Sequence, residues 1–235
     1  MKYPKILVAC PTYDGKDYII DSWVEAIKSI DYPNFEWLIV DNSKGNSYTR
    51  KLREKGYRVM HVNRGSNSRD ALCNAQNFIK HKVLREGYDY WLSLESDLIP
   101  PKDIIWKLLL HSKPVVGCMY YLGSWTDPKI PHPACLFTLD AKEGNMMGTR
   151  MLTPKESDKM LNTGLKQIHG VGLGCTLISK EILKKFSFWT DKRFDNKHSD
   201  VYFFMDLHNK RIPIYVDTNV VVPHFPSDWA NVIDK

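Results

Sequence analysis

Glu95 and Asp97 are two carboxylates separated by one residue, and they directly follow the aromatic and apolar run Tyr90–Leu94. Such a run is typical of a buried strand. Side chains at positions i and i+2 of an extended segment point to the same face, so the two acids are expected to converge where the strand ends. Open α/β sheets bind ligands at that end, and paired carboxylates suit Mg²⁺ or Mn²⁺, which in turn suits a diphosphate. The alternative is a surface turn with two solvated acids.

Asp14 and Asp41 are further acids that follow strand-like runs. Asp14 comes after Lys5–Cys10, and Asp41 comes directly after Phe35–Val40. A single acid after a strand is a common cap or turn residue. Because the carboxyl ends of parallel strands share one edge of a sheet, we expect these acids to meet the later acidic pair in one crevice.

Strand-like and helix-like segments alternate through the first half of the chain. The expected strands are Lys5–Cys10, Phe35–Val40, Tyr57–Val62 and Tyr90–Leu94, and the expected helices are Tyr18–Ile30, Arg69–Arg85 and Lys102–Leu110. Gly87 is expected to end the second of these helices. The alternation predicts an α/β protein with an open, mainly parallel sheet, right-handed crossovers and helices on both faces.

The second half is more elaborate. Its expected strands are Lys113–Tyr121 and Ile214–Val222, and its expected helices are Thr153–Leu161, Lys180–Phe186 and Ser199–Lys210. Residues 122–151 are rich in Gly, Pro and Trp with little periodicity, which indicates a long loop or a β-ribbon. His169–Ser179 places glycines before an apolar run. No internal repeat or linker is visible, so we expect residues 1–235 to form a single domain.

Charge and cysteine content narrow the class of protein. A net charge of +6 favours anionic partners such as nucleotides, phosphates or nucleic acid. No apolar run approaches the roughly 20 residues of a membrane span, and the N-terminal run is too short for a signal peptide. The five cysteines are dispersed without a CxxC pair, which argues against a zinc site or a disulfide scaffold. We therefore expect small buried cysteines in a cytoplasmic protein without an integral membrane segment.

Three familiar active-site motifs do not fit the sequence. The glycine-rich segment GVGLG (170–174) is far from the first strand–helix turn, where a dinucleotide fingerprint should lie. The chain has neither a GxxxxGK[ST] phosphate loop nor a GxSxG nucleophile elbow. His224 lies after the last expected strand between Pro223 and Pro226. It is either a structural or surface residue or, if an edge strand returns to the crevice, a nitrogen ligand of a metal held by Asp97.

Five stretches of the sequence, taken in chain order, resemble the nucleotide-sugar glycosyltransferases of the GT-A fold, most closely the family-2-like group. The matching stretches are ILVACPTYDG (6–15), WLIVDNSKGNS (37–47), VNRGSNSRDALCNAQNFIKHKVLREGYDYWLSLESD (62–97), HGVGLGCTLISKEIL (169–183) and SDVYFFMDLHNKRIPIYVD (199–217). In them, Glu95-Ser96-Asp97 takes the place of the DxD motif. The resemblance covers nearly the whole chain, with residues 1–112 as the nucleotide-sugar-binding half and 113–235 as the acceptor-side half.

The resemblance implies a role for each candidate residue. The donor-binding positions are Thr12, Asp14, Asp41, Arg69 and Glu95, with Asp41 where the nucleoside base is typically contacted. Asp97 and His224 would hold the metal, and Asp200 falls where the general base is found. Arg69 would pair with phosphate oxygens or with Asp97, and Trp125 and His132 would help to form the acceptor side. Glu95, Asn42 and Ser199 depart from the family pattern, each standing where an Asp or another acid is usual.

The implied activity is transfer of a sugar from a nucleotide-diphosphate sugar, expected to be UDP-linked, to an acceptor hydroxyl. Mn²⁺ or Mg²⁺ would assist at the leaving diphosphate, and a base on the opposite face of the sugar would invert the anomeric centre. The acceptor is open between a saccharide, a protein side chain and a hydroxylated base in DNA. Two alternatives are a nucleotidyltransferase that makes the activated sugar and a binding protein that has kept the fold without turnover.

Overall fold

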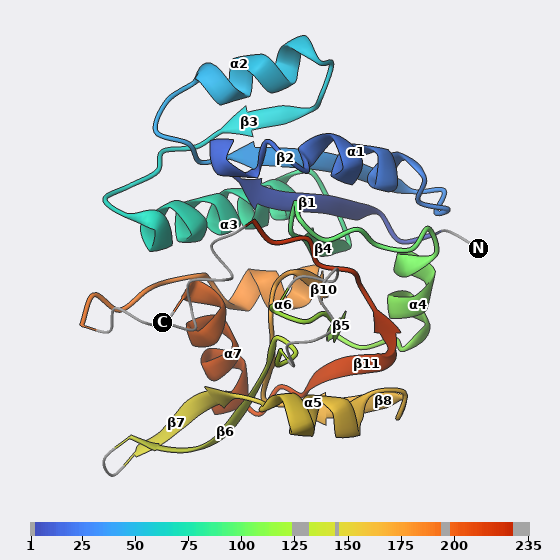
Figure 1. Ribbon diagram of the computed structural model, residues 1–235, viewed down its shortest axis with the longest axis vertical. Coiled ribbons are helices and arrows are strands. Elements are labelled where there is room, and N and C mark those ends of the chain that lie inside the picture. Colours follow the sequence, from blue (N-terminus) through green and yellow to red (C-terminus); the bar gives the residue numbers. More distant parts are fainter. Residues whose placement is uncertain (1–2, 124–131, 144–145, 194–197, 228–235) are drawn as a thin grey trace.

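The computed structural model describes residues 3–123, 132–143, 146–193 and 198–227, and Figure 1 shows their arrangement. The strands of its main sheet are β1 (Ile6–Thr12), β2 (Phe35–Asp41), β3 (Val59–His61), β4 (Tyr90–Leu94), β5 (Val115–Met119), β8 (Leu165–Ile168), β10 (Cys175–Ser179) and β11 (Ile214–Val221). A smaller sheet contains β6 (Leu136–Glu143), β7 (Met146–Met151) and β9 (Gly170–Val171). The helical elements are the 3-10 turn η1 (Asp14–Lys16), α1 (Ile20–Lys28), α2 (Ser47–Glu54), α3 (Ser68–Arg85), α4 (Ile104–Leu110), α5 (Pro154–Met160), α6 (Lys180–Lys185) and α7 (Ser199–Asn209).

The main sheet is open and mostly parallel, as predicted. Among the described residues it has eight strands in the order β3-β2-β1-β4-β10-β5-β11-β8. The strands β3, β2, β1 and β4 are parallel to one another, and β5 and β11 are parallel to each other. The strand β10 runs antiparallel between β4 and β5, and β8 is antiparallel at the edge. Strands from both halves of the chain therefore meet at the β4–β10 pair.

The sheet separates two hydrophobic cores, and β1 contributes to both because its side chains alternate between faces. Ile6, Val8 and Cys10 pack with α1, α2 and α4, whereas Leu7 and Ala9 pack with α3, α6 and α7. These β1 residues are at most 1% exposed. The prediction of helices on both faces is confirmed.

The helix α3 begins and ends with the signals expected from the sequence. The side chain of Asn67 accepts hydrogen bonds from the backbone N–H groups of Arg69 and Asp70, which caps the first turn. After the last turn, Gly87 has a φ of 72°. This left-handed conformation favours glycine, so the predicted helix end is confirmed.

The elements that were not expected from the sequence include α2 and β8. The helix α2 buries only Tyr48, Thr49 and Leu52, so it lacks the longer apolar stripe that marks a helix. The edge strand β8 has four residues and none of them is buried. A segment this short shows no alternation of apolar and polar residues by which a strand could be recognised. Of the two expectations for residues 122–151, the β-ribbon is correct for β6 and β7. Trp125 lies outside the described residues.

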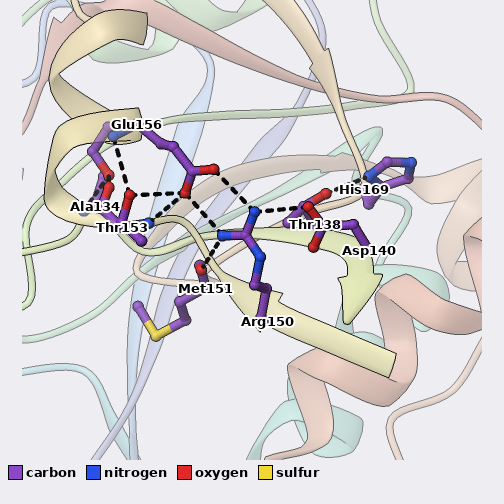
Figure 2. A network of polar contacts seen from close by, with 9 residues as sticks. Ala134, Thr138, Asp140, Arg150, Met151, Thr153, Glu156 and His169 are labelled. Carbon is purple, nitrogen blue, oxygen red and sulfur yellow. Dashed lines mark hydrogen bonds and ion pairs between the residues drawn. The ribbon is translucent and has the colours of Figure 1, made fainter. Parts of the chain in front are cut away.

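A polar network joins the β6–β7 ribbon to α5 (Figure 2). The guanidinium of Arg150 donates to Asp140 Oδ2 at 2.7 Å and to the two carboxylate oxygens of Glu156 at 2.8 and 2.9 Å. The same carboxylate accepts the backbone N–H of Thr153 at 2.8 Å, which completes a capping box at the start of α5. Figure 1 shows this ribbon at one end of the molecule, beside α5 and β8.

The five cysteines are free thiols, and four of them are buried. The expectation of small buried residues therefore holds for all but Cys73, which is partly exposed. In the described part of the chain, no helix combines the length and the apolar character needed to cross a membrane.

We expect Leu92→Ala to lower the free energy of unfolding by about 2–5 kcal/mol, because it leaves a cavity in the central strand β4. Leu92 is 0% exposed. The matched control is Leu110→Ala on α4, where the side chain is 82% exposed and the change should stay within about 0.5 kcal/mol. Denaturant titration measures both, and equal losses would contradict the assigned core.

Candidate functional site

The candidate site lies at the edge of the main sheet where the parallel strands end. Residues that follow β1, β2, β4 and β5 all emerge at this edge because those strands run in one direction. The strand β10 runs the other way, so the glycine segment 172–174 that precedes it lies here too. Residues after β11 also return to this edge, although β11 is not an edge strand because β8 covers its outer side.

Glu95 and Asp97 lie in a turn, so the expectation of an extended segment with both side chains on one face is wrong. The strand β4 ends at Leu94, and the N–H of Leu98 donates to the Glu95 carbonyl at 3.0 Å. This bond closes a four-residue turn. The turn brings the Ser96 hydroxyl to 3.0 Å from the Thr12 hydroxyl at the end of β1. The two acids are still close to each other, but the turn brings them together and not the alternation of side chains along an extended strand.

Asp97 is in direct contact with His224. The carboxylate is 2% exposed, and its Oδ2 lies 3.2 Å from His224 Nε2. The other ring nitrogen, Nδ1, lies 2.8 Å from the Tyr121 carbonyl, which can only accept, so Nδ1 carries a proton. Two backbone bonds hold this arrangement: Ile99 N–H to Pro223 O at 3.1 Å and Phe225 N–H to Asp97 O at 2.9 Å.

Lys16, at the end of η1, contacts the same Oδ2 of Asp97 with its ammonium group. Burial by itself would raise the pKa of Asp97, but the hydrogen bonds and charges of His224 and Lys16 hold that pKa below its usual value. Burial would likewise lower the pKa values of Lys16 and His224, and the Asp97 carboxylate outweighs it, so both are raised. The sequence interpretation assigned Lys16 no role, although a basic residue in the first strand–helix turn was a visible signal.

Glu95 and Asp200 are the further acids of the candidate site. Burial, followed by the charge of Asp97, raises the pKa of Glu95 to about 7, and the charge of Asp200 adds to this shift. Burial also raises the pKa of Asp200. Asp200 lies in the first turn of α7, where its carboxylate accepts the N–H of Val201 at 2.8 Å. The structure thus brings the proposed base near the acidic turn after β4.

Tyr120 forms the wall between these acids and the glycine segment, and the sequence interpretation missed it. Its hydroxyl accepts the N–H of Gly174 at 3.1 Å, and its ring packs edge-on against His224 at 5.8 Å between centroids. A Cβ atom at Gly172 or Gly174 would overlap the Tyr120 side chain. The glycines are therefore needed for close packing on Tyr120. An aromatic residue near the end of the expected strand Lys113–Tyr121 was the available signal.

Asp41 and Asp14 lie at the same edge but do not contact Asp97. Asp41 is fully buried, and its carboxylate accepts the N–H and hydroxyl of Ser43 at 2.9 and 2.6 Å and the hydroxyl of Thr49 at 2.5 Å. Asp14 is exposed, and its backbone N–H donates to the Ser43 hydroxyl at 2.9 Å. Their predicted donor contacts stay predictions.

The remaining candidate residues lie on helices and loops. Arg69 is half-buried in the first turn of α3, which starts near this edge after the parallel strand β3. Ser199 is buried and donates to Gln76 Oε1 at 2.5 Å, which joins α7 to α3. His132 packs so closely against Gly123 that a Cβ atom there would overlap its ring.

The donor set of the site suits a divalent cation whose coordination is completed by a bound ligand. No cluster of three or more His, Cys, Asp or Glu side chains arranged for a metal occurs among the described residues. Asp97 and His224 nevertheless direct an oxygen and a nitrogen toward each other. Mg²⁺-type sites often use one or two protein carboxylates with substrate phosphates as further ligands. The residues present therefore fit the cation implied by the resemblance.

No protein-family model matches the sequence, and no curated protein matches it either. Solved structures do match. The mannosyltransferase PcManGT from Pyrobaculum calidifontis, in complex with GDP-Man and Mn²⁺, has a TM-score of 0.56 at 14% identity, over 94% of this chain and 56% of that one. A structure of S. aureus TarS 1–349 has a TM-score of 0.54 at 15% identity, over 97% of this chain and 62% of that one.

A longer structure of S. aureus TarS has a TM-score of 0.56 at 17% identity and is covered over 38% of its length. The chain thus spans less than two thirds of each of these three structures. Identities this low carry information about the fold alone. The chain has a GT-A-type fold, as the order of its motifs predicts.

Proposed function

We propose that the protein is a glycosyltransferase that moves a sugar from a nucleotide-diphosphate sugar to an acceptor hydroxyl, with Mn²⁺ or Mg²⁺ held by Asp97 and His224. The observation that carries this proposal is the buried Asp97 carboxylate opposite the Nε2 atom of His224, at the ligand-binding edge of a GT-A-type sheet. The similar mannosyltransferase was solved with GDP-Man and Mn²⁺, which supports this donor class.

The chain's own residues would bind and orient the donor. Asp97 and His224 would hold a cation that would neutralise charge developing on the leaving diphosphate. Arg69 at the start of α3 would pair with phosphate oxygens. Thr12, Asp14 and Asp41 would contact the nucleoside side of the donor, and Glu95 would contact the sugar or support the cation from its outer shell. The expected donor is UDP-linked.

Asp200 is proposed as the general base. Burial raises its pKa, which favours proton transfer from a hydroxyl near neutral pH. A base opposite the leaving diphosphate would direct attack in line and invert the anomeric centre. Proposed acceptors are a saccharide, a protein side chain or a hydroxylated DNA base, and the net charge of +6 favours an anionic one.

A panel of UDP- and GDP-sugars incubated with Mn²⁺ tests the activity, with release of nucleoside diphosphate as the measurement. We expect slow hydrolysis of at least one donor without an acceptor. Consumption of a sugar phosphate and a nucleoside triphosphate would instead identify a nucleotidyltransferase. Donor binding without any turnover would identify a binding protein on the same fold.

Asp97→Asn should weaken Mn²⁺-dependent binding of UDP or GDP at least about 10–100-fold, because even an outer-shell partner of a metal is worth that much. Isothermal titration with and without Mn²⁺ measures the effect. The control is Asp103→Asn, which removes a surface carboxylate that pairs with Lys107 at 3.0 Å. Equal nucleotide affinity in Asp97→Asn and the wild type, at an unchanged melting temperature, would refute the metal assignment.

Asp200→Asn should leave donor binding intact while lowering kcat for transfer about 10²–10⁴-fold, the usual contribution of a general base. Asp206→Asn on the same helix is the matched control, because Asp206 accepts from Trp189 Nε1 at 2.8 Å rather than facing the acidic turn. Steady-state kinetics with a saturating donor separate kcat from KM. Transfer at the wild-type rate in Asp200→Asn would mean that another group is the base.

A further inference from the structure

We infer that Lys16 is an exchangeable counter-ion: its ammonium pairs with Asp97 and moves to the donor diphosphate when a divalent cation binds Asp97 and His224. This inference rests on the proposed function and deepens it. It assigns a diphosphate-binding role to a residue outside the motifs that carry the family resemblance, and it predicts that metal and donor bind in a coupled manner.

The backbone of Lys16 is anchored while its side chain reaches the crevice. Its N–H donates to the Tyr13 carbonyl at 2.9 Å within η1, and the neighbouring Asp14 N–H is bound to Ser43 Oγ at 2.9 Å. The Lys16 side chain is only 14% exposed and ends at Asp97 Oδ2. A lysine combines a compact charge with a flexible four-carbon stem, so the ammonium can change partners without moving η1.

Charge balance explains why the ammonium would move. Two carboxylates, those of Glu95 and the buried Asp97, already place negative charge in the turn after β4. A diphosphate adds more negative charge and needs cations to enter. Lys16 and His224 are the basic side chains in contact with Asp97 among the described residues.

Competition at one oxygen explains when the ammonium would move. Both Lys16 Nζ and His224 Nε2 approach the same atom, Asp97 Oδ2. A divalent cation held between the carboxylate and the imidazole would lie next to the ammonium, and like charges at such distances repel strongly in a buried site. The ammonium must then withdraw, and the diphosphate that reaches the cation is the nearest new anion.

The test is Lys16→Met, which keeps most of the length of the unbranched side chain and removes its charge. Titration with Mn²⁺ alone, followed by the electron paramagnetic resonance of free Mn²⁺, should show affinity increased about tenfold, because one charge-assisted competitor is gone. Titration with UDP or GDP in saturating Mn²⁺ should show affinity reduced about tenfold, because one charge-assisted contact to the diphosphate is lost. The two shifts have opposite signs.

Lys51→Met is the matched control. Lys51 pairs with Asp17, directly after η1, at 2.6 Å on the surface, and its side chain is 51% exposed. Neither affinity should change in this variant. Lys16→Arg keeps the positive charge and should recover most of the nucleotide affinity, which separates a loss of charge from a general disturbance of the site.

The outcomes distinguish the inference from the proposed function. Weaker binding of both Mn²⁺ and nucleotide in Lys16→Met would identify a fixed structural ion pair and overturn the exchange. If nucleotide binding needs Lys16 but no Mn²⁺, the lysine permanently replaces the metal, and this outcome would also overturn the proposed exchange. A wild-type protein that binds neither Mn²⁺ nor either nucleotide would contradict the proposed function itself, and the exchange with it.

Discussion

The arrangement of the site depends on compensating one buried negative charge, the carboxylate of Asp97. An ion removed from water costs several kcal/mol unless partners and hydrogen bonds offset that cost. Here an ammonium and an imidazole meet the same carboxylate oxygen, and backbone hydrogen bonds hold the histidine segment against the turn that carries Asp97. The positions of η1, the turn after β4 and the segment after β11 all follow from this need.

The sheet makes that compensation possible because it brings distant segments to one edge. Parallel strands deliver η1 and the acidic turn, while the antiparallel β10 places the glycine segment beside them. Tyr120 fills the space that Gly172 and Gly174 leave and packs on His224. Two hydrophobic cores, one on each face of the sheet, hold these strands in place. The polar residues of the site lie in the segments that follow the strands.

Repulsion among the carboxylates of the site connects its stability with the proposed function. The charges of Asp97 and Asp200 both act on Glu95, and a group of carboxylates that repel one another favours the binding of cations. Asp41 differs from them, because its carboxylate is already satisfied by Ser43 and Thr49. Carboxylates that follow neighbouring strands therefore have different roles. Asp41 stabilises the loop after β2, whereas Glu95 and Asp97 concentrate negative charge after β4.

The sequence by itself determined the order of most elements, the two-faced sheet and the presence of acids after strands, because apolar periodicity and caps such as Asn67 and Gly87 are local signals. It did not identify α2 or β8, where few side chains are buried, and it assigned an extended backbone to Glu95–Asp97, where a turn forms. The family resemblance had already paired His224 with Asp97, whereas only the tertiary structure showed their direct contact and the contact of Lys16 with Asp97, since these contacts join residues 127 and 81 positions apart. Contacts of that range depend on the path of the chain between strands, which no local pattern specifies.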